Sequence, residues 1–397
     1  MYLTSLKLIQ FRCYADVQLE IPVAGVRIIG DNATGKTSLL EAIGLLATTR
    51  SFRGAQDRDL VRWESGQDFG LAPFGRVEAT VETSDGRYEL GIGIQLADDG
   101  ESVTSKRFEL DRHPTPAHKM VGHLTTVSFA PEDVQLVIGP PAERRRSLDI
   151  LISQIDRAYM RHLSRYSKVL RQRNSLLKSF ARDRVRHTAA PAVTQIAYWD
   201  EQLVAEGGYL IATRASVLSD MNRAMRERSR EISAGGDFSL SYVSRTAVQV
   251  SALAQMKSAK DAVIQANAQF HDDLESLRRD EFRRGVTLSG PHRDDMLFEL
   301  DDRSLARFGS RGQQRLGVLA LKLAEADVIA STTGDSPVFL LDDILSELDQ
   351  SHRSLLLDTV TSHGSQVILT SADREVGFES GLSELGIYVA DGAAKNE

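Results

Sequence analysis

The sequence predicts an α/β protein with an antiparallel β lobe and an inserted helical arm. Three observations support this fold class. A strand, a glycine-rich loop and a helix follow one another near the N-terminus, apolar and polar residues alternate between 75 and 110, and apolar residues then recur at helical spacing. We expect 1–130 to be the first half of a head with its β lobe, 131–285 the arm, and 286–397 the second half of the head.

The first part of the chain opens with two predicted strands. Leu6, Leu8 and Phe11 begin one, and residues 26–29 form a buried one that runs directly into the glycine-rich loop. Apolar residues after the loop keep helical spacing, which predicts a helix there. Between the two alternating runs of the β lobe, Asp85-Gly86 has the composition of a hairpin turn.

The middle of the chain is predicted to be a helical hairpin or short arm. Apolar residues recur at helical spacing from 148 to 177 and again, after the interruption at Pro191, from 196 to 217. Gly235-Gly236 closes this arm, and one strand and a last helix follow it. We expect the final residues, 393–397, to be a frayed tail.

Composition places the chain among ordinary soluble globular proteins, with 42% hydrophobic and 26% charged residues. The sequence shows no signal peptide and no membrane-spanning run, so we expect a cytoplasmic protein without a membrane partner. The single cysteine, Cys13, fits a reducing compartment and is expected to be a small buried hydrophobe. The net charge of −7 argues against a general nucleic-acid coat. Between 139 and 187, however, thirteen Arg and Lys face only four Asp and Glu.

The glycine-rich loop matches the G-x-x-x-x-G-K-[ST] phosphate loop at every required position. In such a loop, backbone N–H groups and a helix N-terminus cradle the β- and γ-phosphates of ATP. Lys36 would add a point charge to the phosphates, and the Thr37 hydroxyl would bind Mg²⁺. The cofactor-binding residues predicted here are Gly30, Asp31, Asn32, Ala33, Thr34, Gly35, Lys36, Thr37 and Ser38.

An acidic strand end near the C-terminus supplies the other half of the predicted ATP site. The apolar run 338–341 leads into Asp342 and Asp343. We expect Asp342 to hold Mg²⁺ and Asp343 to polarise the attacking water as a catalytic residue with Lys36. The alternative for this pair is two solvated carboxylates before a turn.

A serine-glycine-glutamine motif, Ser310 with Gly312 and Gln313, precedes the acidic strand, and Asp349 follows it. This order of motifs looks like an ABC-type P-loop ATPase head with an antiparallel β lobe and an inserted helical arm domain. In that class the serine motif of one subunit covers the nucleotide of another, which implies an ATP-controlled homodimer. Ser310 would then be catalytic, Gly312 and Gln313 would bind nucleotide, and Asp349 would cross the interface. For Ser310 and Asp349 alike, the alternative is an ordinary helix N-cap.

Motifs along nearly the whole chain resemble the RecF family of bacterial recombination and repair ATPases, in the SMC-like branch of ABC ATPases. The resemblance rests on the segments 8–14, 30–43, 50–53, 129–133, 144–146, 290–295, 310–315, 340–343 and 346–349. ABC ATPases usually carry Glu where this chain has Asp343, and the Asp is typical of RecF. The shorter side chain predicts slow hydrolysis, because a misplacement of about 1 Å can reduce a rate by roughly 100-fold.

The resemblance implies several partners and contacts. The partners are single- and double-stranded DNA with gaps or junctions, the RecR mediator, and also RecO and RecA, with RecA loading as the outcome. It further implies that Arg12 approaches the nucleotide and that Gln135 or the pair Glu132-Asp133 senses the γ-phosphate. His292 is a candidate for a catalytic role or, more simply, a core or turn histidine.

The basic stretch is a DNA-binding candidate in its own right, because cations that neutralise phosphates release counterions. Its alternative is the solvated face of an amphipathic helix. Other functions stay open at this point: a nucleotide-gated DNA clamp with negligible hydrolysis, the ATPase subunit of a membrane transporter, and a small-molecule kinase. The candidate DNA contacts are Arg144, Arg145, Arg146, Arg157, Arg161 and Lys168.

Overall fold

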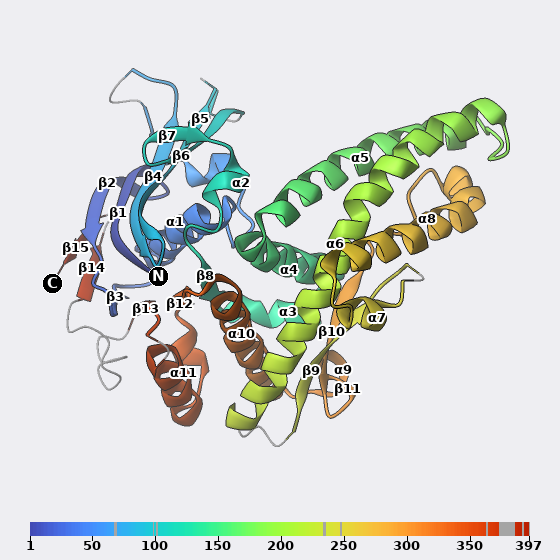
Figure 1. Cartoon of the computed structure of the whole chain (residues 1–397). Coiled ribbons are helices and arrows are strands. Elements are labelled where there is room, and N and C mark those ends of the chain that lie inside the picture. The colour runs from blue at the N-terminus through green and yellow to red at the C-terminus, as the bar shows by residue number, and fades with distance from the viewer. Residues whose placement is uncertain are drawn as a thin grey trace. The chain divides into compact units, whose positions relative to one another are not determined.

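The computed structural model divides the chain into two compact units (Figure 1). Unit 1 consists of Met1–Asp133 and Glu325–Glu397, and unit 2 is Val134–Ala324. Helix α10 (Arg311–Thr333) begins in unit 2 and ends in unit 1. The structure describes residues 1–66, 70–97, 99–100, 102–232, 236–246, 248–362, 364–372, 386–390 and 393–396.

The observed units differ from the expected three parts at the second boundary. The predicted arm begins at 131 and unit 2 begins at Val134, but unit 2 also contains residues 286–324. Strand pairing explains this, since β10 (Asp295–Leu300) pairs antiparallel with β9 (Phe238–Val243) along its whole length. The division into two head halves and an arm, as functional parts, stays a prediction.

One sheet of unit 1 is antiparallel throughout. Within the described residues it has six strands in the order β2-β1-β4-β5-β6-β7. Buried and half-exposed residues alternate along β4, so one face of the sheet is covered. Asp85-Gly86 joins β4 to β5 with Thr83 opposite Gly86, as predicted. The lobe is larger than expected because the first two strands of the chain belong to it. The strands are β1 (Tyr2–Phe11), β2 (Tyr14–Glu20), β4 (Phe74–Thr83), β5 (Gly86–Leu96), β6 (Val103–Leu110) and β7 (His113–Thr115).

The second sheet of unit 1 is mainly parallel and combines strands from the N-terminal and C-terminal parts of the chain. Its described strands follow the order β15-β14-β3-β13-β12-β8, and β15 alone runs antiparallel to its neighbour. Strand β3 lies between β13 and β14, and β13 separates β3 from β12. Parallel strands present their carboxyl ends at one edge, where ligands bind in such sheets. The strands are β3 (Gly25–Ile29), β8 (Thr126–Phe129), β12 (Val338–Asp342), β13 (Val367–Ser371), β14 (Gly386–Ala390) and β15 (Ala393–Asn396).

One hydrophobic core joins both sheets of unit 1 through helix α1. Leu39 and Leu46 of α1 are fully buried in the same cluster as Val81 of β4 and Leu340 of β12. Each such side chain contributes about 1.5–3 kcal/mol on burial, so α1 is held firmly on two sides. The described helices of unit 1 are α1 (Lys36–Thr48), α2 (Ala117–Met120), the end of α10 and α11 (Gln350–Ser362), with 3-10 turns η1 (Asp57–Leu60) and η4 (Ile344–Glu347); η3 (Pro131–Val134) lies at the boundary.

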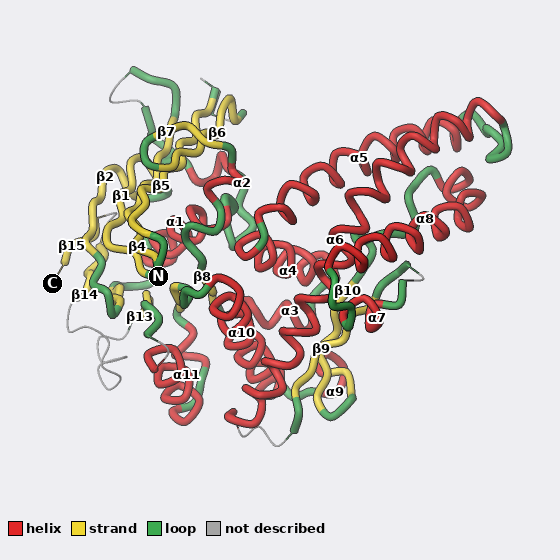
Figure 2. The backbone as a smooth tube through the Cα atoms, viewed as in Figure 1, coloured by secondary structure: helices red, strands yellow, loops and turns green. Residues whose placement is uncertain are grey.

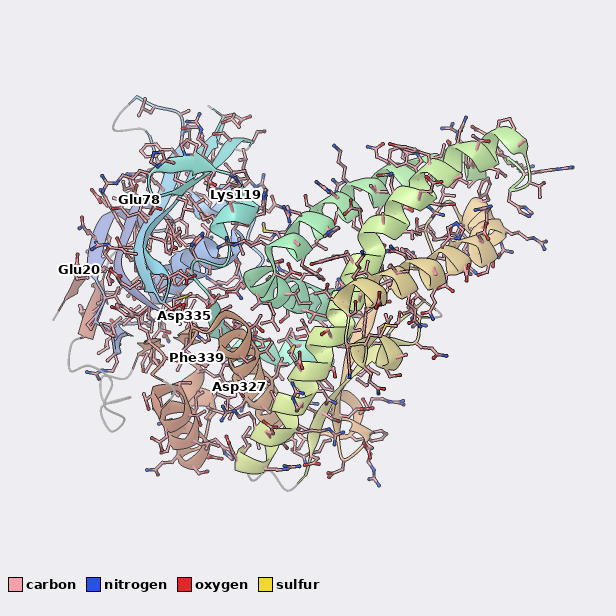
Figure 3. All side chains as sticks on the ribbon, viewed as in Figure 1. Glu20, Glu78, Lys119, Asp327, Asp335 and Phe339 are labelled. Carbon is pink, nitrogen blue, oxygen red and sulfur yellow. The ribbon has the colours of Figure 1, made fainter. Side chains whose placement is uncertain are left out.

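Asp335, labelled in Figure 3, connects distant parts of unit 1 before β12 begins. Its carboxylate accepts hydrogen bonds from the ammonium group of Met1 at 3.3 Å and from the Ser84 hydroxyl at 2.9 Å. The start of β1 and the β4–β5 turn are thereby fixed to the segment that precedes β12.

Unit 2 is mostly helical, as Figure 2 shows by colour. Asp156 separates α4 from α5 as an N-cap, because its carboxylate accepts from the N–H groups of Ala158 and Tyr159. Pro191 lies in the first turn of α6, where a missing N–H is tolerated. The described elements are α3 (Gln135–Ile138), α4 (Pro141–Ile155), α5 (Arg157–Arg182), α6 (Ala190–Ile232), β9, α7 (Val250–Ala254), α8 (Ala259–Arg284), β10, β11 (Arg303–Ser304), α9 (Leu305–Phe308) and the start of α10.

Two expectations about the ends of the chain are wrong. Ala393–Asn396 is not frayed but forms β15, because it pairs with β14. Cys13 is not a buried hydrophobe but is exposed, since it lies in the β1–β2 turn. Gly235 of the predicted arm closure lies outside the described residues. Among the helices that the structure describes, none is long and apolar enough to cross a membrane.

Candidate nucleotide-binding site

The phosphate loop joins β3 to α1, as its sequence predicts. Gly35 is the N-cap of α1 with φ 113°, a conformation that L side chains rarely adopt. A Cβ atom at Gly35 would lie 2.5 Å from the Cys13 Sγ and 2.9 Å from the Tyr14 hydroxyl, so glycine is required for space as well. The Tyr14 hydroxyl donates to the Gly35 carbonyl at 3.0 Å. The β1–β2 turn therefore packs directly on the loop and fixes its shape.

Lys36 places a buried cation at the centre of the loop. Its Nζ donates to the carbonyls of Gly30 at 2.6 Å and Asp31 at 2.8 Å. The first turn of α1 contains no acidic residue, so the positive end of the helix dipole is not neutralised there. An ammonium group, a helix N-terminus and a glycine-shaped loop together suit a phosphate group.

Residues from opposite ends of the chain meet beside the loop. The Thr37 hydroxyl donates to the Asp342 carboxylate at 2.9 Å. Hydroxyl and carboxylate oxygens are the ligands that Mg²⁺ accepts in phosphate-loop sites, together with water and substrate oxygens. The donor set therefore fits Mg²⁺ at the place where the sequence predicted it.

Thr370, at the end of β13, was missed by sequence reasoning. Its hydroxyl donates to Asp342 Oδ1 at 2.8 Å and accepts from the Asp343 N–H at 3.0 Å. Because β13 lies between β3 and β12, a side chain at its carboxyl end can hold both acidic residues. The available signal was a polar residue closing the apolar run 367–369, which was not connected to the acidic strand.

The unusual backbone conformation of Asp343 explains why an aspartate, and not a longer side chain, occupies this position. Its φ is 50° and ψ 19°, in the left-handed region, where Asp is tolerated better than longer non-glycine residues. Burial raises the pKa of its carboxyl; Lys36 opposes this shift, while Asp342 and Glu347 add to it. A carboxylate with a raised pKa is a stronger base, which suits the polarisation of water.

Arg12 is fixed in a polar cluster next to the loop. Its Nε and Nη2 donate to the fully buried carboxylate of Glu41, both at 2.8 Å, and its Nη1 donates to the Asp59 carbonyl at 2.8 Å. The Ser51 hydroxyl also donates to Glu41. Contact between Arg12 and a nucleotide stays a prediction, but the guanidinium is already anchored by protein groups.

Ser310 and Asp349 are both helix N-caps, the simpler of the two interpretations considered for each. The Ser310 N–H donates to Gln313 Oε1 at 2.8 Å, and the Gln313 N–H donates to the Ser310 hydroxyl at 3.2 Å, which is a capping box on α10. Asp349 accepts from the His352 N–H at 3.0 Å at the start of α11, and this bond, with those from Ser351 and the His352 ring, lowers the pKa of Asp349. Both caps are exposed, so a role across an interface stays a prediction.

The proposed γ-phosphate sensors lie near the boundary of the two units. Asp133 accepts from the Ala130 N–H at 2.9 Å and so caps the turn after β8. Glu132 and Gln135 are exposed. A sensing role for any of the three stays a prediction.

The basic stretch divides into a buried part and an exposed part. The Arg144 side chain is 8% exposed and pairs with both oxygens of Asp295 at 2.7 and 2.8 Å, so a DNA contact by this residue stays a prediction. Arg145 is half-buried and donates to the Asp294 carbonyl at 2.8 Å, and Arg146 is also half-buried. Helix α5, in contrast, contains no Asp or Glu and exposes a row of cations. These are Arg157, Arg161, Arg165, Lys168, Arg171, Lys178 and Arg182.

His292 is a structural residue in unit 2. The Tyr166 hydroxyl donates to its Nδ1 at 2.6 Å, and its Nε2 lies 3.4 Å from the Thr287 carbonyl. Burial, with help from Arg293, lowers the pKa of His292 to about 4, so its ring is neutral at pH 7. This matches a core histidine rather than an acid–base catalyst.

Comparisons with known proteins place these features in one family. The RecF/RecN/SMC N terminal domain family matches residues 2–395. A protein of Thermomicrobium roseum described as "DNA replication and repair protein RecF" is 42% identical over 391 residues, 98% of either chain. The protein of that description from Bacillus subtilis is 34% identical over 396 residues, 99% of either chain.

Solved structures agree with the sequence comparisons. "The recombination mediator protein RecF-ATPrS in RecFOR pathway" has a TM-score of 0.83 at 27% identity and covers 100% of this chain and 98% of its own. An Smc head domain of Pyrococcus furiosus has a TM-score of 0.53 at 16% identity, covering 100% and 96%, which shows the fold alone. The predicted fold class, an α/β ABC-type ATPase head with a β lobe and an inserted helical part, is confirmed.

Proposed function

We propose that this chain, which belongs to the RecF family of DNA replication and repair proteins, is an ATP-controlled DNA-binding protein of recombinational repair. The observation that carries the proposal is the 2.9 Å hydrogen bond between Thr37 and Asp342, with Lys36 set in the adjoining loop. These groups lie 305 residues apart in sequence, yet together they form one phosphate and Mg²⁺ site.

Each residue of the site has a defined task in this proposal. The loop N–H groups and Lys36 bind the β- and γ-phosphates of ATP, and Thr37 and Asp342 hold Mg²⁺. Bound Mg²⁺-ATP supplies the phosphoryl group and the charge that a second subunit can recognise. Thr370 orients Asp342, and Asp343 accepts a proton from the attacking water. The short carboxylate and its constrained backbone favour slow hydrolysis, in the manner of a timer.

The serine motif and the acidic loop are proposed to act in trans. Ser310 and Gly312 begin helix α10 in unit 2, and their exposure leaves them accessible to another molecule. The N-terminus of a long helix is a site for an anion, here the γ-phosphate held by a second copy. Asp349 would contact the same interface. ATP binding would then drive homodimerisation.

DNA is proposed to bind along α5 (Figure 1). The exposed cations of this helix recur mostly at intervals of three and four residues, so they fall on one side of a 26-residue segment without carboxylates. At about 1.5 Å per residue, the helix spans nearly 40 Å, similar to one turn of duplex DNA. We expect gaps and junctions in single- and double-stranded DNA to be the substrates, with RecR, RecO and RecA as partners in the cytoplasm.

A mixture of two defective variants tests the shared ATP site. Lys36→Met removes the loop cation and should lose ATP binding, while Ser310→Ala should bind ATP as a monomer but fail to dimerise. Mixed together, they should form one intact composite site and recover a fraction of ATP hydrolysis. If the mixture hydrolyses no more ATP than the sum of the separate variants at every concentration, the shared site is rejected.

A nucleotide-gated clamp with negligible hydrolysis remains the second candidate, favoured by the short side chain of Asp343. A single-turnover measurement on the wild-type chain with gapped DNA separates the two. Release of phosphate within one binding event supports the ATPase, and retention of intact ATP until dissociation supports the clamp.

A further inference from the structure

An exposed aromatic ring lies next to the serine motif. Phe308 ends α9, two residues before the Ser310 N-cap, and its side chain is 71% exposed. Among the large apolar side chains that the structure describes, Trp63 alone is more exposed. Aromatic side chains that contribute most to an interface have this combination of area and accessibility in the free protein.

The ring is presented by a rigid segment. Leu305, three residues earlier, is buried, and a Cβ at Gly317 of α10 would lie 2.5 Å from its side chain. Gln314 of α10 donates to the Leu305 carbonyl at 3.4 Å and the Gly309 carbonyl at 3.2 Å. These contacts hold α9 against the first turns of α10. Because the backbone is already fixed, little conformational entropy would be lost when Phe308 is covered.

The segment that carries Phe308 is cationic. The segment 303–315 contains four arginines and no acidic residue, and the Arg307 guanidinium lies 5.8 Å from the Phe308 ring centroid. In unit 1, the segment 342–349 contains four acidic residues and no cation, beside the loop that would hold the ATP phosphates. Each copy of the chain therefore carries both a cationic and an acidic segment. In a dimer with two-fold symmetry, the cationic segment of each copy can face the acidic segment of the other copy.

We propose that Phe308, flanked by Arg307, is the apolar anchor by which the serine motif docks onto the ATP-loaded face of a second copy of this chain. This inference rests on the proposed ATP-dependent dimer and adds the residue that contributes most to its affinity. The ring would be covered in the dimer, and the arginines would face the acidic segment and the phosphates of the partner copy.

Sedimentation velocity of the full chain with ATP, ADP and no nucleotide tests this inference. Phe308→Ala should raise the ATP-dependent dimer dissociation constant by roughly 30-fold, because truncation of an interface anchor has an effect of this size. Phe308→Tyr should keep most of the affinity. Ile264→Ala, which truncates a 56% exposed apolar side chain on α8, is the matched control and should dimerise like the wild type.

The outcomes separate the anchor from the dimer itself. If the wild type stays monomeric with ATP, the proposed function and this inference fail together. If the wild type dimerises and Phe308→Ala dimerises equally well, the anchor is wrong while the shared site stands. ATP binding to the monomeric variant is measured in parallel, and a loss there overturns the inference, because Phe308 would then support its own subunit.

Discussion

Two polar clusters of this molecule differ in how their charges are satisfied. At the phosphate loop, the Lys36 ammonium donates to the neutral carbonyls of Gly30 and Asp31, and burial raises the pKa of the Asp343 carboxyl. In unit 2, Arg173 is 1% exposed and donates to the carboxylates of Asp200 at 2.7 Å and Glu281 at 2.6 Å.

This difference distinguishes a site that can bind an anionic ligand from a cluster whose charges are already neutralised within the fold. A cation on carbonyls retains most of its attraction for an anion, whereas a cation between two carboxylates is already neutralised. The segment 290–295 belongs to the second kind, because His292, Asp294 and Asp295 all bond to neighbouring elements of unit 2. A conspicuous motif therefore indicates a ligand site only when its charges are not paired within the fold.

The largest expected effect concerns the completed cluster. Arg173→Met should reduce the free energy of unfolding by about 3–5 kcal/mol, because Asp200 and Glu281 would be left buried without their cation. Urea denaturation followed by circular dichroism measures the change. Arg171→Met, two residues away on the exposed side of α5, is the control and should change stability by less than about 0.5 kcal/mol. A similar small change in both variants would show that the buried pairs are not what holds unit 2 together.

The next effect depends on pH. The pKa of His292 is lowered to about 4 in the fold, so the folded chain binds fewer protons than the unfolded chain between that value and the ordinary one. Stability from this group is present above about pH 6.5 and is lost as pH falls toward 4, by up to about 3 kcal/mol in total. We expect His292→Gln to lose less stability than the wild type over that interval. Parallel pH profiles for the two proteins would contradict the assignment.

A smaller effect is expected at the ligand site. Thr370→Val keeps the shape of the side chain but removes the hydroxyl that orients Asp342 and Asp343, so the Mg²⁺ concentration needed for half-maximal ATP binding should rise roughly 10-fold. Thr370→Ser should restore the wild-type value. Equal Mg²⁺ dependence in the valine and wild-type proteins would exclude this orienting role.

The smallest effect concerns a strained residue of the loop. Ala33 has a φ of 66°, which glycine adopts without steric penalty. Ala33→Gly should raise stability by roughly 0.5 kcal/mol, the relief of strain exceeding the added entropy of the unfolded chain. Ala142→Gly in the first turn of α4 should instead lower stability, and differential scanning calorimetry can compare the two. A loss at both positions would show that the loop is not strained at Ala33.

What could be predicted from the sequence was local. The phosphate loop, the Asp85-Gly86 turn and the acidic strand end each occupy a few consecutive residues whose backbone geometry follows from their types. The partners of Arg173 and the role of Thr370 depend on segments far apart in sequence, which no periodicity connects. The ion pair of Arg144 could not be predicted for the same reason, because a run of arginines does not show which one turns inward toward Asp295.

The position of β3 has a consequence for the synthesis of the protein. Both neighbours of this strand, β13 and β14, lie beyond residue 366, so β3 leaves the ribosome long before anything exists for it to pair with. At about 5–20 residues per second, the interval is roughly 20–70 seconds. During that time, the apolar strand β3 and the phosphate loop that follows it lack the neighbouring strands of their sheet, while Val134–Ala324 is synthesised in full. We therefore expect the N-terminal part of the nascent chain to bind a chaperone, and the ATP site to form only when translation is almost finished.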